Sequence, residues 1–164
     1  MNINKELFIP KNLFSKKSIC TIILLTVLPN LVGLIVLPNI FGLKIHFFQY
    51  FIFLSAVIFG PFAGALAGIF GSVHVALALN NPYVLIGNAL LGFFAGLLAK
   101  RIGIVKAILA AYFIQLPWLV YSDIFLAGMP AQAVQMIVAS LFVSNILLGF
   151  FALKSYKRIE RALA

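Results

Sequence analysis

Six long apolar runs, separated by short turns, leave this sequence few ways to fold. They cover residues 18–37, 45–59, 62–79, 83–99, 104–127 and 131–153. A helix that crosses a bilayer needs about 20 predominantly apolar residues, and most of these runs approach that length. Only 9% of the residues are charged, whereas soluble domains carry about 25%. The sequence therefore predicts an all-α, polytopic membrane protein with six transmembrane helices.

Basic residues give the predicted orientation. They precede the first run, occupy the loop at 100–106 and follow the last run, and Lys44 is the one exception. Lysine and arginine collect in cytoplasmic loops, so we expect both termini to be cytoplasmic. This pattern explains the net charge of +9 without nucleic acid. We expect a cytoplasmic N-terminal segment (1–17), a six-helix transmembrane domain (18–153) and a basic cytoplasmic tail (154–164), in the cell membrane.

Glycines at helical spacing predict where two helices pack closely. Gly64 and Gly68 lie four residues apart in the third run, and Gly92 and Gly96 repeat this spacing in the fourth. Small residues four apart let the backbones of neighbouring membrane helices approach each other. We expect these four glycines to form helix contacts.

Polar side chains in the last four runs predict a binding site in the outer half of the membrane. At about 1.5 Å per residue, they lie at similar depths below the outer ends of four different helices. Polar groups are costly in lipid and usually face the bundle interior or a cavity. The candidate substrate-binding residues are His74, Asn88, Gln115, Trp118, Ser122, Asp123, Gln132 and Gln135.

Each candidate also has a structural interpretation. His74 would bond a carbonyl of a neighbouring helix, and Asp123 would be a solvated charge at a helix end. Asn88 and the glutamines would join helices by hydrogen bonds. Trp118 and Tyr83 would be aromatic residues at the membrane interface, which is the interpretation favoured for Tyr83.

The residues that most enzymes need are missing. Asp123 is the only acidic residue within a span, so paired-carboxylate catalysis has no candidates. Two histidines and the single cysteine, Cys20, lack the spacing of a metal site. The sequence also lacks the G-x-x-x-x-G-K-S/T motif that binds ATP phosphates. We expect no enzyme activity, no metal and no cofactor.

The pattern resembles the S components of energy-coupling factor (ECF) transporters, which capture vitamins and related micronutrients. The similarity lies in six short helices, in a G-P-x-x-G-x-x-x-G stretch and in a glycine-rich fourth helix followed by basic residues. The stretch consists of Gly60, Pro61, Gly64 and Gly68, and the fourth helix contains Gly87, Gly92 and Gly96.

This resemblance implies a pocket at the outer side, lined by the third to sixth helices and covered by the loop at 38–44. It also implies a transmembrane coupling protein and two cytoplasmic ATPase subunits as partners. The expected function is therefore capture of a small micronutrient by an importer subunit. The alternatives are a non-catalytic membrane scaffold of a cell-envelope complex, or an autonomous small channel or carrier. The largely apolar inner half disfavours the channel or carrier.

Overall fold

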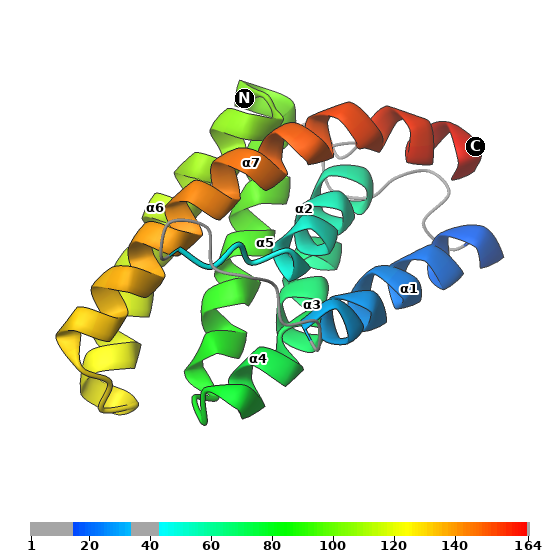
Figure 1. The fold of residues 1–164 in the computed structure, drawn as a ribbon. Helices are drawn as coiled ribbons and strands as arrows, with labels where there is room; N and C mark the ends of the chain where they lie inside the picture. Colours follow the sequence, from blue (N-terminus) through cyan, green and yellow to red (C-terminus); the bar gives the residue numbers. More distant parts are fainter. Residues whose placement is uncertain (1–14, 34–42, 164) are drawn as a thin grey trace.

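A computed structural model describes residues 15–33 and 43–163, and every regular element in these ranges is a helix (Figure 1). The all-α prediction is therefore confirmed for the described residues. In chain order the helices are α1 (Lys16–Gly33), α2 (Phe48–Phe59), α3 (Pro61–Gly71), α4 (Val73–Ala78), α5 (Tyr83–Ile102), α6 (Ile104–Tyr121), the π-helical turn η2 (Ser122–Leu126) and α7 (Ala131–Leu163). The predicted loop at 38–44 lies almost wholly outside the described residues, as does most of the N-terminal segment.

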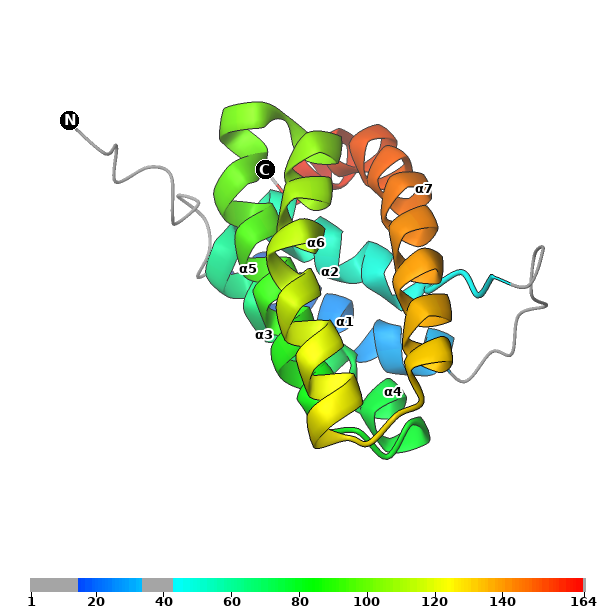
Figure 2. The ribbon, with the colours of Figure 1, turned by 90° about the vertical axis from the view of Figure 1, so that its left-hand side faces the viewer.

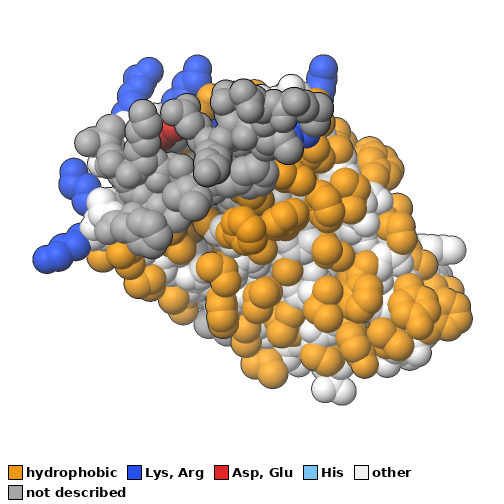
Figure 3. All heavy atoms as spheres, turned by 180° about the vertical axis from the view of Figure 1, so that it is seen from behind, with side chains coloured by type: hydrophobic (Ala, Val, Ile, Leu, Met, Phe, Trp, Pro, Cys, Tyr) orange, Lys and Arg blue, Asp and Glu red, His pale blue; other side chains and the backbone are white. Residues whose placement is uncertain are grey.

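Five helical stretches in the described residues are long and apolar enough to cross a membrane. They are α1, α3 with α4, α5, α6 with η2, and α7. Their outward-facing side chains are largely hydrophobic, as Figure 3 shows for one face, where lysine and arginine side chains collect toward one end. This is the surface of a helical membrane protein.

The second predicted span, 45–59, is shorter than expected. Its helix, α2, begins at Phe48 and has 12 residues, or about 18 Å at 1.5 Å per residue. That length falls short of the roughly 30 Å hydrocarbon core. Residues 43–47 are not helical and instead run beside α7 (Figure 2).

Two serines of α7 bond the backbone of this non-helical segment. The Lys44 N–H donates to Ser140 Oγ at 3.2 Å, and the His46 N–H donates to Ser144 Oγ at 3.0 Å. Two extended residues rise about 6.6 Å, which matches the roughly 6 Å between residues four apart in a helix. Backbone groups in a bilayer need such partners, so the serines allow the segment to remain unwound beside α7.

α3 and α5 approach each other closely enough for their backbones to touch. A Cβ added to Gly64 would lie 2.8 Å from the backbone carbon of Gly92 and 2.7 Å from Ala56 Cβ. A Cβ on Gly68 would meet the carbonyl group of Asn88, and one on Gly96 would lie 2.8 Å from Pro61 Cα. The two glycine pairs therefore lie where backbone meets backbone.

The third span is broken rather than continuous as predicted for 62–79. α3 ends at Gly71 and α4 begins at Val73. The side chain of Asn30, from α1, occupies the break: its Nδ2 donates to the Phe70 carbonyl at 2.7 Å, and its Oδ1 accepts from the His74 N–H at 2.9 Å. These two groups would bond each other in an unbroken α-helix. The Asn30 amide replaces that bond and fixes the kink.

α7 extends beyond its predicted span. It continues without interruption to Leu163, so the basic stretch expected as a separate tail after residue 153 forms its last turns, which bend over the end of the bundle (Figure 1). Tyr156 and Ile159 pack against the core, whereas Lys157, Arg158 and Arg161 are exposed. One face of these turns is therefore anchored and the other is basic.

Candidate functional site

A small cavity with mostly apolar walls and several polar side chains lies between α4, α5, α6 and α7 and the segment that precedes α2. Its volume is about 40 Å³. The polar or aromatic residues that line it are His46, Tyr83, Asn88, Gln115, Trp118, Ser122 and Asp123. Apolar wall is supplied by Val75 of α4, by Leu79 directly after that helix, and by Ile137 and Leu141 of α7.

Hydrogen bonds close the end of the cavity that lies next to the turn before α5. Asp123 is 4% exposed, and its Oδ1 accepts from Asn81 Nδ2 at 2.7 Å. Asn81, itself fully buried, also accepts from the Tyr83 N–H at 3.1 Å through Oδ1. The turn before α5 is thereby tied to η2, at the end of α6. A buried carboxylate needs such donors, because burial without partners is costly.

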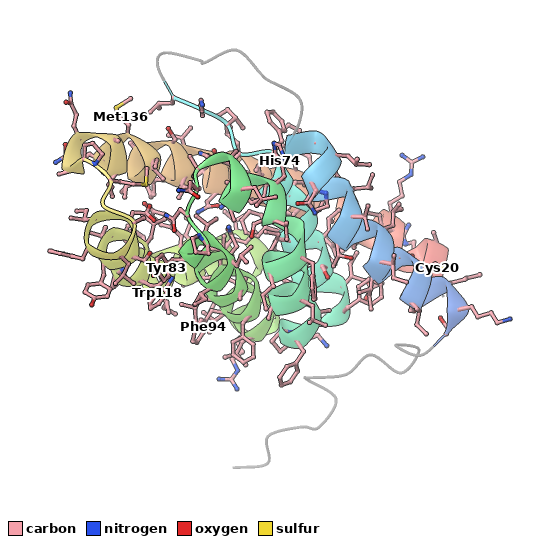
Figure 4. All side chains as sticks on the ribbon, turned by 90° about the horizontal axis from the view of Figure 1, so that it is seen from below. Cys20, His74, Tyr83, Phe94, Trp118 and Met136 are labelled. Carbon is pink, nitrogen blue, oxygen red and sulfur yellow. The ribbon has the colours of Figure 1, made fainter. Side chains whose placement is uncertain are left out.

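Trp118 forms one wall of the cavity, and a hydrogen bond from its indole N–H holds the side chain in place. Its Nε1 donates to the Tyr83 carbonyl at 3.2 Å, and Figure 4 shows the two side chains close together. Gly87 leaves room for this wall, since a Cβ there would lie 3.2 Å from Gln115 Nε2 and 3.4 Å from Trp118 Cδ1. The ring therefore has a fixed orientation and a face available for packing.

Gln115 and Asn88 contribute amides to the same cavity. Asn88 Nδ2 donates to the Val84 carbonyl of its own helix at 3.1 Å. Gln115 is 3% exposed, and its Oε1 has no hydrogen-bond partner within the described part of the chain. Buried polar atoms almost always have partners, so the Gln115 oxygen is an acceptor available to water or a solute.

The structure brings together some of the predicted residues and separates the others. Asn88, Gln115, Trp118, Ser122 and Asp123 share the cavity. His74 does not line it: the imidazole lies against Gly33, where a Cβ would be 2.8 Å from its Cδ2, at the end of α1 and apart from Trp118 (Figure 4). The kink at α4 turns this residue toward α1.

The two predicted glutamines of the last span also lie outside the cavity. Gln132 and Gln135 are exposed, because the buried face of α7 is formed by Val134, Leu141 and Leu148 instead. Gln135 borders an open apolar groove of about 620 Å³ between α6 and α7. Only 11 side chains line this groove, and Gln135 is their one amide, as expected of a lipid-facing surface.

The sequence interpretation missed three residues of the site. His46 reaches the cavity from the unwound segment, and this unwinding has no local sequence signal. Asn81 lies in the short turn between the apolar runs at 62–79 and 83–99, although an asparagine before a membrane helix can also bond a carboxylate. Tyr83 was assigned to the membrane interface, yet it lines the cavity and accepts from Trp118.

The chemistry of the site is that of hydrogen bonding. Among the described residues, no three histidines, cysteines or acidic residues gather to hold a metal ion. Cys20 is exposed near the start of α1 (Figure 4). Amides, one carboxylate and one tryptophan can orient a small solute through donors, acceptors and a ring face.

Comparison of the chain with known protein families, with curated proteins and with solved structures finds no match.

Proposed function

We propose that this protein is a substrate-binding membrane subunit of an importer, which captures a small polar solute from the outer side of the cell membrane. The observation that carries the proposal is the meeting of Asn88, Gln115, Trp118 and Asp123, from α5, α6 and η2, around one buried cavity. Polar groups gathered within a membrane bundle are costly, which favours a binding role over packing alone.

The cavity must enlarge to receive a solute. A volume of about 40 Å³ holds water molecules, whereas pockets for small molecules usually measure about 300–1,000 Å³. α4 is the wall that can move most easily, because Ala76 is its one buried residue and the helix has only six residues. Val75 on this element and Leu79 directly after it line the cavity, so displacement of α4 would open the site.

The resemblance to ECF S components supplies the remainder of the proposal. In that class of importer, a transmembrane coupling protein and two cytoplasmic ATPases drive release of the solute to the inside. The solute here would be a vitamin or a related micronutrient, with its ring stacked on Trp118. The protein itself would bind and release, without catalysis.

Solute retained during purification tests this function. The protein purified in mild detergent from cells grown in rich medium should release a small molecule on denaturation, detectable by mass spectrometry. Trp118→Ala and Asp123→Ala should reduce the retained amount, while the exposed-residue control Gln132→Ala should not. Equal retention by all three variants, or no solute in the wild type, would contradict the proposal.

A membrane scaffold is the second candidate, favoured by the small cavity volume and by the bonds that Asp123 and Trp118 already form within the protein. A scaffold would retain no solute, and its partners would contact its helices. An importer subunit would support uptake of a labelled solute by cells that express the chain, and deletion of the chain would abolish that uptake. A scaffold would support no such uptake.

A further inference from the structure

Two carboxamides without partners lie at the centre of the bundle, beyond the inner end of the cavity. Gln49 on α2 and Asn145 on α7 are both fully buried. Neither the oxygen nor the nitrogen of either side chain has a hydrogen-bond partner within the described residues. Leaving a buried polar group unpaired costs about 1–3 kcal/mol, so this arrangement destabilises the protein as it stands.

Backbone hydrogen bonds place these two amides at similar depth. The His46 N–H donates to Ser144 Oγ, which precedes Asn145, and the Gln49 N–H donates to the His46 carbonyl at 3.0 Å. Gln49 lies one turn before Phe53, and Asn145 lies one turn before Leu148. Phe53 and Leu148 belong to the same buried core cluster, so both amides face that core.

The two amides lie next to residues that line the cavity. Phe48 lines the cavity and directly precedes Gln49, while Leu141 lines it one turn above Asn145 on the same helix face. Gln115 adds a third amide with a free oxygen inside the cavity. Asp123, the acidic residue among those that line the cavity, lies at the opposite, outer end and is bonded to Asn81.

We infer that Gln49, Asn145 and Gln115 form the deep part of the binding site and select an uncharged, planar heterocycle with amide-like edges. This inference rests on the proposed function. A carboxamide offers an acceptor and a donor side by side, which matches a ring carbonyl next to a ring N–H. A charged group at this depth would lack a counter-ion and would be strongly disfavoured.

Trp118 provides the assay, because it is the single tryptophan in the chain and lines the cavity. The full chain in detergent is titrated with uracil, with 1,3-dimethyluracil, which lacks the N–H donors, and with protonated 4-aminopyridine. Uracil should change the Trp118 fluorescence saturably. The dimethylated ring and the cation should bind at least tenfold more weakly, since sites built on hydrogen bonds reject analogues that lack them.

Gln49→Met and Asn145→Leu test the residues themselves, with Gln135→Met as the matched control on the lipid face. The two core variants should bind uracil at least tenfold more weakly and, without solute, should melt at a higher temperature than the wild type, because each removes an unpaired buried amide. The control should change neither property. Lower melting temperatures would show that the amides are bonded internally and would overturn the inference.

The outcomes separate this inference from the proposed function. A retained solute that is cationic, or one whose affinity is unchanged in Gln49→Met, would refute the amide site and leave the importer function standing. Absence of any retained or bound solute would refute both. Preference for the cation over uracil would likewise overturn the proposed solute class.

Discussion

The contact between α3 and α5 gives the sharpest stability prediction. In Gly64→Ala the new methyl group would lie 2.7 Å from Ala56 Cβ and 2.8 Å from the Gly92 backbone carbon, against 3.4 Å or more in ordinary contacts. The methyl group would therefore be about 0.6 Å too close to the Gly92 backbone, which cannot rotate away as a side chain can. Overpacking of this kind costs about 1–3 kcal/mol and occasionally more. We expect a cost at the upper end of that range, because two helices must separate.

Gly149→Ala is the matched control. A Cβ there would meet Ile108 Cδ1 at 3.4 Å and Val105 at 3.8 Å, which is ordinary contact. The variant should be stabilised by up to about 1 kcal/mol, because alanine favours a helix over glycine by that amount. Unfolding in mixed micelles with increasing SDS, followed by circular dichroism, measures both variants. Equal midpoints for Gly64→Ala and Gly149→Ala would refute the close approach of α3 and α5.

Three further variants test other features of the bundle. Asn30→Leu should lower stability by about 1–3 kcal/mol, because the Phe70 carbonyl and the His74 N–H lose their partner; an unchanged SDS midpoint would argue against the bridged kink. Ser144→Ala should expose 43–47 to protease, because the His46 N–H loses its acceptor, and a wild-type cleavage rate would count against that bond. Asp123→Asn should keep the wild-type melting temperature, since a carbonyl oxygen still accepts from Asn81; a clearly lower melting temperature would show that the carboxylate has a further partner.

The sequence was sufficient to predict the elements that depend on local composition. Long apolar runs predict the five helices of membrane-spanning length, because hydropathy and length are read directly from the chain. Depth below the helix end also predicts three residues of the cavity. Gln115, Trp118 and Ser122 share one face of α6 and its continuation, and all three line the cavity.

What escaped prediction depends on contacts between distant residues. The unwinding before α2 requires Ser140 and Ser144, roughly a hundred positions later in the chain. The kink that turns His74 away from the cavity requires the Asn30 amide from α1. Helical spacing alone does not tell which face of α7 is buried. The sequence therefore predicts Gln132 and Gln135 in the binding site, whereas the buried amide of this helix is Asn145.

The unbroken course of α7 has a mechanical consequence. Leu141 forms cavity wall and Arg161 lies in the exposed basic end, with about 30 Å of continuous helix between them. A hinge along that length would break backbone hydrogen bonds. A displacement of α7 at the cavity wall would therefore also displace its basic end. The cavity and the basic end of the molecule are therefore joined by one continuous helix, α7.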